Sequence, residues 1–254
     1  MKMRWKGFKR VRRQVCKRID KRIDQLGLAD VSEYRSYICS HRQEWKHLYS
    51  LCTVTITRFY RDIGIFDCLK EEVLPHLALA CEGRAIKCWS GGCASGEEPY
   101  SLAIIWKIVH EQKFPKTGFK VVATDITPAL LQRAEKACYK SGVLRNLPRN
   151  WTSKAFIRKE DGSYCLKEEI KRLVSFRLHD IKRPIKDAPF NLIMCRNLAF
   201  TYFDKVLQLR LVKKLARELE QDGILVIGSH EDLPRGWKQY FSTWPGQRKI
   251  FRKI

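Results

Sequence analysis

The sequence predicts an α/β protein in which a Rossmann-like, mostly parallel sheet closes with an antiparallel C-terminal hairpin and follows a small all-helical domain. Near the N-terminus, apolar residues recur at the three- and four-residue spacing of an amphipathic helix. From residue 84 onwards, short β-branched or aromatic runs alternate with helical stretches, a pattern typical of βαβ units. These observations divide the chain into a basic helical domain over residues 1–75 and an α/β domain over residues 76–254.

The N-terminal helix is predicted from an apolar stripe on one face, with basic residues on the other faces. The stripe consists of Phe8, Val11, Val15, Ile19, Ile23 and Leu26. Gly27 then supplies a C-cap, and either Asp30 or Ser32 can cap a second helix. A further helix over residues 66–81 completes the predicted helical domain.

Five apolar segments of the α/β domain predict strands. They cover residues 85–89, 119–124, 173–178, 190–195 and 223–228. Helices are expected between them, over residues 98–109 and 205–220. The last segments, residues 237–244 and 249–254, flank the turn signal Pro245-Gly246 and predict a hairpin. An open parallel sheet that ends in such a hairpin is the layout of the class I methyltransferase fold.

Composition indicates a globular chain without a membrane span or a secretion signal. Hydrophobic residues make up 44% and charged residues 30% of the 254 positions. The N-terminus is basic rather than apolar, and no apolar run approaches the ~18 residues of a membrane helix. The ten cysteines show neither paired CxxC nor Cys/His spacing. We therefore expect a soluble cytoplasmic protein with reduced thiols and no metal site.

The formal net charge of +23 is concentrated at the N-terminus. Residues 1–24 contain eleven Lys or Arg against Asp20 and Asp24, a net charge of +9. Such a field favours an acidic partner, which could be an acidic protein, a nucleic acid or an anionic membrane surface. A solvated basic face without a dedicated partner is the alternative.

A Gly-rich turn joins the first predicted strand to the helix that follows it. Gly91, Gly92 and Gly96 allow the backbone to approach a nucleotide-like ligand closely. The turn matches neither the GK[ST] of a phosphate loop nor the GxGxxG of dinucleotide folds. Instead Glu97 and Glu98 open the helix, which suits the positively charged amino and sulfonium groups of S-adenosylmethionine. Carboxylates at a helix start also complement the helix dipole without any ligand.

Asp125 follows the next predicted strand, where an acidic side chain accepts both ribose hydroxyls of an adenosine cofactor. Its alternative role is an N-cap for the helix that starts near Pro128. The combination with the Gly-rich turn favours the cofactor role. We therefore expect S-adenosylmethionine as the cofactor and S-adenosylhomocysteine as its product.

Four blocks of the chain resemble, in order, the signature blocks of the CheR-type protein-glutamate O-methyltransferases. They are Thr57-Arg-Phe-Tyr-Arg-Asp62, Trp89-Ser-Gly-Gly-Cys-Ala-Ser-Gly-Glu-Glu-Pro-Tyr-Ser-Leu-Ala103, Ala123-Thr-Asp-Ile126, and Phe190-Asn-Leu-Ile-Met-Cys-Arg-Asn197 with Tyr202-Phe-Asp204. The resemblance covers nearly the whole chain. It implies a chemotaxis-related enzyme that methylates glutamate carboxylates of an acidic protein partner.

The resemblance also implies which residues form the site. Those expected to contact the cofactor are Thr57, Arg61, Gly91, Gly92, Glu97, Asp125, Ile126, Asp180, Ile181 and Arg196. Arg61, Arg196 and Tyr202 would be catalytic and would lie nearest the transferred methyl group. The link before Tyr202 is one residue longer than in the family, so that either Thr201 or Tyr202 would face that group.

Two further departures from the family pattern fall around the acceptor pocket. Thr55 stands where the family commonly has Asn, and Gly228-Ser-His-Glu231 stands where it has Gly-His-Ser-Glu. The cofactor prediction is therefore better founded than the substrate prediction.

Transfer to a carboxylate requires positioning more than acid–base chemistry. A glutamate is already ionised at pH 7, so orientation and partial desolvation suffice. Arg61 and Arg196 would orient the carboxylate, because guanidinium groups bind carboxylates bidentately. The structural alternatives are an ion pair of Arg61 with Asp62, and of Arg196 with Asp180 or Asp204.

Two other functions fit parts of the sequence. A methyltransferase of RNA or of a small metabolite would use the same cofactor site, and the charge of +23 suits nucleic acid. However, the Asn/Asp-Pro-Pro-Tyr/Phe block and the Pro-Cys nucleophile of many base methyltransferases do not occur. A non-catalytic cofactor-sensing module is disfavoured because the glycines, acids and arginines are all present. The sequence does not indicate an oligomeric state.

Overall fold

The computed structural model describes residues 5–9, 11–52 and 57–254. The chain forms two compact units, Met1–Ile56 and Thr57–Ile254. The unit boundary therefore lies earlier than the predicted division between residues 75 and 76. The reason is that the helices over residues 63–80 bury Phe66, Leu69 and Leu74 in the core of the larger unit.

The smaller unit, called the helical unit below, contains three α-helices within its described residues, 5–9 and 11–52. They are α1 (Arg12–Gln25), α2 (Val31–Ser40) and α3 (Glu44–Cys52), preceded by the 3₁₀ turn η1 (Trp5–Phe8). Ile23 from the predicted apolar stripe packs against Tyr34 and Ile38 of α2. Asp30 caps α2 by accepting a hydrogen bond from the backbone N–H of Glu33 at 2.9 Å. The amphipathic pattern thus positions the basic faces of α1 away from this small core.

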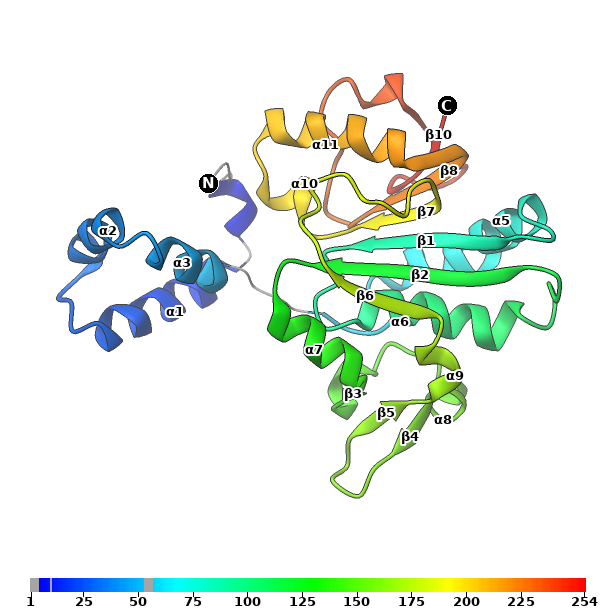
Figure 1. The fold of residues 1–254 in the computed structure, drawn as a ribbon, viewed down its shortest axis with the longest axis horizontal. Helices are drawn as coiled ribbons and strands as arrows, with labels where there is room; N and C mark the ends of the chain where they lie inside the picture. Colours follow the sequence, from blue (N-terminus) through cyan, green and yellow to red (C-terminus); the bar gives the residue numbers. More distant parts are fainter. Residues whose placement is uncertain (1–4, 10, 53–56) are drawn as a thin grey trace. The chain divides into compact units, whose positions relative to one another are not determined.

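The larger unit, called the sheet unit below, is built on a seven-stranded sheet with the order β6-β2-β1-β7-β8-β10-β9 (Figure 1). The strands are β1 (Ala85–Gly91), β2 (Gly118–Asp125), β6 (Val174–Leu178), β7 (Phe190–Cys195), β8 (Leu219–Ile227), β9 (Phe241–Thr243) and β10 (Ile250–Lys253). Strands β6, β2, β1, β7 and β8 run parallel, whereas β10 pairs antiparallel with both β8 and β9. This order confirms the predicted class I methyltransferase layout with its C-terminal hairpin.

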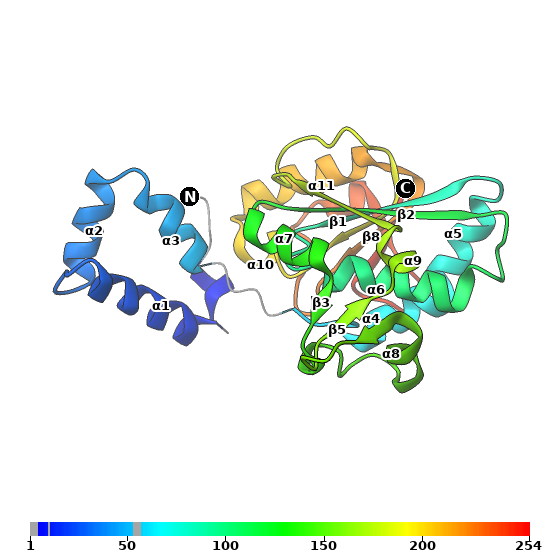
Figure 2. The same ribbon diagram turned by 60° about the horizontal axis from the view of Figure 1, so that its bottom comes forward.

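Helices cover both faces of the sheet, as Figures 1 and 2 show. One face carries α4 (Ile63–Cys68), the π-helical turn η2 (Leu69–Val73), α5 (Leu74–Ala80), α6 (Glu97–Ile105), its π-helical continuation η3 (Trp106–His110) and α7 (Pro128–Lys136). The other face carries α10 (Ala199–Tyr202) and α11 (Lys205–Glu218). Parallel strands covered on both faces must be apolar on both sides, which is why these strands read as continuous apolar runs.

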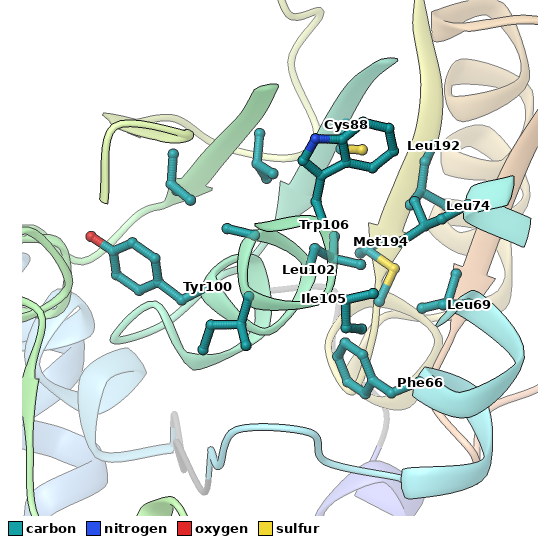
Figure 3. Close-up of a cluster of buried hydrophobic side chains, with 14 of the residues drawn as sticks. Phe66, Leu69, Leu74, Cys88, Tyr100, Leu102, Ile105, Trp106, Leu192 and Met194 are labelled. Carbon is teal, nitrogen blue, oxygen red and sulfur yellow. The ribbon is translucent and has the colours of Figure 1, made fainter. Parts of the chain in front are cut away.

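Alternation along the central strands produces two separate cores. Cys88 of β1 and Met194 of β7 point toward Trp106 and Phe66 in the first core, drawn in Figure 3. Their neighbours Trp89 and Ile193 point into the second core beneath α11. The two cores pack on opposite faces of the sheet and thereby fix the positions at which its parallel strands end.

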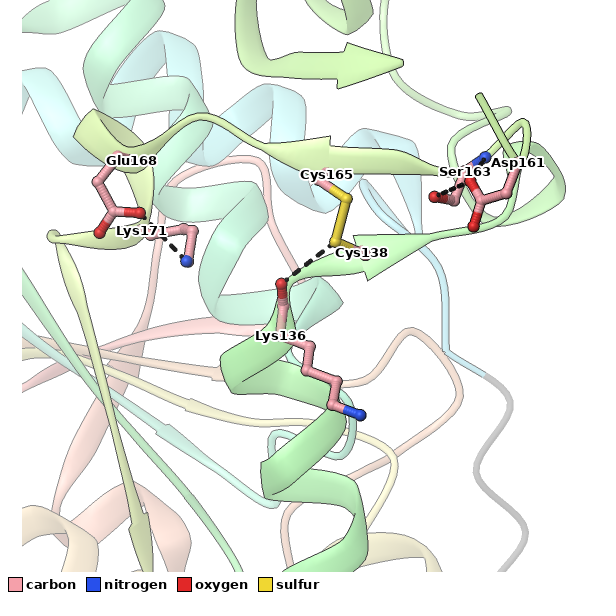
Figure 4. Close-up of a disulfide and its surroundings, with 7 residues drawn as sticks. All are labelled: Lys136, Cys138, Asp161, Ser163, Cys165, Glu168 and Lys171. Carbon is pink, nitrogen blue, oxygen red and sulfur yellow. Dashed lines mark hydrogen bonds and ion pairs between the residues drawn. A yellow bond between two sulfur atoms is a disulfide. The ribbon is translucent and has the colours of Figure 1, made fainter. Parts of the chain in front are cut away.

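A second, three-stranded antiparallel sheet lies on the side of α6 and α7, with the order β3-β5-β4. Its strands are β3 (Cys138–Tyr139), β4 (Phe156–Arg158) and β5 (Tyr164–Leu166), with η4 (Ser141–Val143), α8 (Arg149–Ala155) and α9 (Glu168–Lys171) around them. No sequence pattern predicts this sheet, because its strands are only two or three residues long. Cys138 and Cys165 form a disulfide across β3 and β5 (Figure 4). The expectation of ten reduced cysteines is therefore wrong for this pair, and the other eight are free thiols.

Two further findings concern membranes and metals. Among the described residues, no helix combines the length and the apolar character needed to cross a membrane. The same residues contain no group of three or more His, Cys, Asp or Glu arranged to hold a metal ion.

Candidate functional site

The Gly-rich turn lies at the carboxyl end of β1, between β1 and the start of α6. Gly92 and Gly96 have φ angles of 81° and 92°, a region that residues with a side chain adopt at a cost. A Cβ atom on Gly92 would lie 2.4 Å from the Leu198 side chain. The backbone N–H groups of Gly92 and Cys93 donate to the carbonyl of Thr124 on β2, at 2.7 and 2.9 Å. The turn is thus held tightly against the end of the neighbouring strand.

Asp125 ends β2 and contacts this turn directly. The residue is 9% exposed, and its carboxylate accepts hydrogen bonds from the backbone N–H groups of Ala94 at 3.0 Å and Thr127 at 2.9 Å. The N-cap residue of α7 is Thr127, so the alternative capping role predicted for Asp125 is not the arrangement found. The structure therefore brings together the two features that predicted an adenosine cofactor.

Apolar and polar side chains flank Asp125 where β2 and β6 end. Ile126 is 43% exposed, and Leu178, paired with Asp125 in the strand register, is 63% exposed. Ile181 is buried, and its side chain lies 2.8 Å from where a Cβ atom on Gly91 would stand. Asp180 instead forms an ion pair with Lys182 at 3.1 Å, near the surface. These positions leave an open apolar surface next to a buried carboxylate.

The two glutamates that open α6 have different partners. Both oxygens of the Glu97 carboxylate accept from the Ser95 hydroxyl at 3.0 Å, and Thr57 also hydrogen-bonds to it. Burial raises the pKa of Glu97 despite these donors. Glu98 accepts from the Ser90 hydroxyl at 2.8 Å and from Arg196 at 3.0 Å. Glu97 therefore belongs to the Gly-rich turn, whereas Glu98 belongs to a charge cluster.

That charge cluster centres on Arg196, which follows β7. The Arg196 side chain is only 1% exposed. Its guanidinium donates to the carboxylates of Glu98 at 3.0 Å and Asp62 at 2.8 Å. It also donates to the carbonyl of Arg61 at 2.8 Å and lies 5.1 Å from the ring centroid of Phe66. A buried cation is tolerated only when it is paired in this way. The predicted partners Asp180 and Asp204 are not used; Asp204 instead caps α11 through the backbone N–H of Leu207.

Arg61 and Tyr202 lie near this cluster but are less buried. Arg61 donates to the Asn197 side-chain carbonyl at 3.3 Å, and it makes at least one further interaction. Tyr202 is half-buried; burial raises the pKa of its hydroxyl, and the charge of Arg61 partly opposes that rise. The two side chains therefore share one electrostatic environment beside Arg196.

Glu231 is the site residue that the sequence analysis missed. The residue is 1% exposed, and its carboxylate accepts hydrogen bonds from three backbone N–H groups, those of Gly228 at 2.8 Å, Asn197 at 2.7 Å and Leu198 at 3.1 Å. It also accepts from the Thr201 hydroxyl at 2.6 Å. The Gly228-to-Glu231 block could have identified it, but neighbours more than thirty residues away reveal its role.

The contacts of Glu231 also involve the segment between Asn197 and Tyr202. The hydroxyl of Thr201, one of the two residues expected to face the methyl group, donates to Glu231. Burial raises the pKa of Glu231. A single carboxylate thus fixes the segment after β7, the start of α10 and the end of β8.

Comparison with known proteins gives results in keeping with this geometry. The family model "CheR methyltransferase, SAM binding domain" matches residues 55–250. Chemotaxis protein methyltransferase 2 of Vibrio cholerae is 31% identical over 226 residues, which cover 85% of this chain and 78% of that protein. A chemotaxis protein methyltransferase of Listeria innocua is 34% identical over 184 residues, covering 72% and 68%. Among solved structures, the N-methyltransferase NodS of Bradyrhizobium japonicum with S-adenosylhomocysteine is 18% identical, covering 74% of this chain and 87% of that chain, with a TM-score of 0.42.

Proposed function

This chain belongs to the CheR methyltransferase family, and we propose that it transfers methyl groups to glutamate carboxylates of an acidic protein partner. It is an S-adenosylmethionine-dependent methyltransferase, as the family model and the named relatives establish. The observation that best supports a cofactor site at these residues is the hydrogen bond from the backbone N–H of Ala94, in the Gly-rich turn, to the Asp125 carboxylate at 3.0 Å.

The residues at the ends of β1, β2 and β6 fit S-adenosylmethionine. Asp125 would hold the ribose hydroxyls, and the buried Glu97 carboxylate would attract the amino group and the positively charged sulfur. Gly91 and Gly92 would let the backbone approach the ligand. A Cβ atom at either position would also collide with the side chain of Ile181 or of Leu198. The proposed set also includes Thr57, Ile126, Asp180 and Ile181. When bound, the cofactor supplies an activated methyl group on its sulfonium.

The acceptor carboxylate would meet Arg61 and Tyr202. Arg61 is half-buried and carries a guanidinium suited to a carboxylate. The Arg196 guanidinium is already engaged by two carboxylates and by the carbonyl of Arg61. We therefore propose that Arg196 holds the backbone of Arg61 in place and so positions the Arg61 side chain next to the reacting groups. An ionised glutamate needs no general base, so orientation and exclusion of water are the contributions expected of these residues.

The basic helix α1 supports an acidic partner. Arg12, Arg13, Lys17 and Lys21 are exposed on it. Charges of one sign that face solvent accelerate association with an oppositely charged surface. As part of the same proposal the enzyme works in the cytoplasm, where its eight free cysteines would stay reduced.

The acceptor can be identified with radiolabelled S-adenosylmethionine and a cell lysate. Label that protease removes, RNase leaves in place and mild base releases would indicate a carboxyl ester on protein. Label that RNase removes, or label found only in small molecules, would contradict the proposal and favour an RNA or metabolite methyltransferase. The Asp125→Ala variant, deficient in cofactor binding, serves as the matched control for non-enzymatic labelling.

A further inference from the structure

The disulfide fastens a short edge strand that is otherwise held mainly by the buried side chain of Tyr139. Cys138 and Cys165 stand directly opposite each other in the antiparallel pair β3–β5, followed by the single further pair Tyr139 and Tyr164. In the order β3-β5-β4, β3 lies at the edge and pairs with β5 alone. Figure 4 shows the bond joining the two strands where the chain leaves α7. Besides this covalent link, the strand is held by Tyr139, whose ring lies edge-to-face with that of Phe59 at 4.9 Å between centroids.

Tyr139 connects this edge strand to the Gly-rich turn. Its side chain is buried, and its hydroxyl donates to the carbonyl of Ser95 at 2.8 Å. A Cβ atom on Gly96 would lie 3.1 Å from that hydroxyl, so the contact is close. The Ser95 hydroxyl in turn donates to Glu97 at 3.0 Å. A shift of β3 therefore displaces Tyr139 and acts on the turn through one chain of contacts.

Asp125 and Tyr139 approach the turn from the two ends of α7. Asp125 precedes the helix and binds the N–H of Ala94, whereas Tyr139 follows it and binds the carbonyl of Ser95. Adjacent residues of the turn are thus held from both sides. Loosening the Tyr139 side leaves the turn tethered by Asp125 but less well ordered for a ligand.

The disulfide is accessible to a reductant. Cys138 is exposed and Cys165 is half-exposed. A thiolate of a dithiol attacks one sulfur and forms a mixed disulfide, which the second thiol then resolves. The protein gains two electrons and two protons as two thiols, and the dithiol becomes a cyclic disulfide. The Cys138 sulfur lies 3.4 Å from the carbonyl of Lys136, so the reduced thiol has a hydrogen-bond acceptor at the end of α7.

We propose that Cys138 and Cys165 form a reversible redox site that sets the affinity of the enzyme for its S-adenosyl ligands through Tyr139. The disulfide form holds Tyr139 against Ser95 and binds the ligand tightly; the dithiol form releases the edge strand and binds it more weakly. The inference rests on the proposed cofactor role of the Gly-rich turn and is independent of the identity of the methyl acceptor.

The test compares one preparation in two redox states. Half of the air-oxidised protein is reduced with dithiothreitol, which is then removed under argon. Thiol titration in denaturant should count eight thiols in the oxidised half and ten in the reduced half. Calorimetry with S-adenosylhomocysteine should show a Kd about 2- to 12-fold higher after reduction, the equivalent of one lost hydrogen bond.

Three variants identify the route. The double variant Cys138→Ser, Cys165→Ser should bind weakly and ignore reduction, whereas Cys16→Ser, Cys39→Ser, which removes two exposed free cysteines, should respond like the native protein. Tyr139→Phe should bind weakly in both states. A titration of ten thiols before reduction, or equal Kd values in the two states, would overturn the proposal. So would a Tyr139→Phe variant with a full redox response. Failure of the oxidised native protein to bind S-adenosylhomocysteine would instead refute the cofactor site itself.

Discussion

The helical unit and the sheet unit carry their charges in opposite ways. In the helical unit, the cations of α1 point mainly to solvent, and a partly buried cluster joins Arg22, Glu44 and Tyr34. In the sheet unit, buried carboxylates and a buried guanidinium gather where the parallel strands end. Burial of charge is costly unless every partner is in place. This difference supports the proposal that the sheet unit holds the chemistry and that the positive field of α1 attracts a partner.

Two buried glutamates show the contrast most clearly. Glu44 accepts hydrogen bonds from Arg22 at 3.0 and 2.8 Å and from the Tyr34 hydroxyl at 2.9 Å. The hydrogen bond from Arg22 keeps the pKa of Glu44 low, as expected for a structural ion pair. Glu231 instead accepts from uncharged donors, and burial raises its pKa. The hydrogen bonds of Glu231 thus hold backbone segments and Thr201 in place, whereas Glu44 forms an ion pair.

The largest effect is expected for Arg196→Ala, which breaks the charge cluster of the sheet unit. Removal of the cation leaves the partly buried carboxylates of Asp62 and Glu98 without their charged partner, and the free energy of unfolding should fall by about 3–5 kcal/mol. Turnover per folded molecule should fall by about 10²-fold, since Arg61 loses its anchor. The affinity for S-adenosylhomocysteine should change less than turnover.

Urea denaturation and saturating-cofactor kinetics measure the two effects of Arg196→Ala. Arg177→Ala is the matched control, because Arg177 pairs with Asp187 at the surface and should cost about 0–1 kcal/mol. Normal turnover with weakened cofactor binding in Arg196→Ala would assign this residue to the cofactor instead of to positioning Arg61.

Asp125→Ala tests the proposed cofactor site of the sheet unit. Loss of a charged acceptor for the ribose hydroxyls should weaken S-adenosylhomocysteine binding by about 1.5–3 kcal/mol. Isothermal calorimetry at fixed pH measures the change. Asp20→Ala, which removes an exposed aspartate of α1, should leave the affinity as it was. Equal affinities for Asp125→Ala and the native protein would remove Asp125 from the site.

The sequence predicted those parts of the molecule that depend on local pattern. The alternation of strands and helices predicted the sheet, and Asp125 with the Gly-rich turn was predictable because both follow adjacent parallel strands. Contacts between distant segments were not predictable in this way. Arg196 meets Asp62 across 134 residues, and Glu231 acts through backbone N–H groups that leave no trace in residue type.

Two other features show why local pattern misleads. An amphipathic helix over residues 63–80 looks the same whether it packs on other helices or on a sheet, so the unit boundary was set too late. The disulfide joins cysteines 27 positions apart, and its formation depends on β3 and β5 lying side by side. Neither strand was long enough to be predicted from alternation.

A smaller effect is expected from acid on the helical unit. Because the folded-state pKa of Glu44 is lowered, its contribution to stability is complete above the unfolded pKa of about 4.3. This contribution is lost as the pH falls through the lowered value. Glu44→Gln should therefore destabilise the helical unit by about 1 kcal/mol at pH 7, and the difference from the native protein should vanish in acid.

Far-ultraviolet circular dichroism of urea titrations at several pH values tests this expectation for Glu44. The exposed Glu33→Gln variant, at the start of α2, is the control for a change of surface charge. The contribution of Glu231 to stability should change with pH in the opposite direction, and should be larger in acid, since its raised pKa favours protonation in the folded state. A Glu44→Gln variant whose loss of stability is the same at every pH would show that Arg22 does not set the behaviour of Glu44.

The smallest effect on stability, and the most informative one on the partner, is expected on the basic face of α1. Replacement of Arg12, Arg13, Lys17 and Lys21 with Gln should change the free energy of unfolding by no more than about 0.5 kcal/mol, because these side chains face solvent. The apparent KM for the macromolecular substrate should rise several-fold, whereas cofactor affinity should stay unchanged. The native KM should also rise with salt beyond physiological strength, where the Debye length falls below ~8 Å.

The matched control replaces four exposed cations of α11, Lys205, Arg210, Lys213 and Arg217, with Gln, which lowers the net charge equally in the sheet unit. If both quadruple variants raise the KM alike, only net charge matters; if neither does, the basic face of α1 is a solvated surface and the acidic partner docks elsewhere.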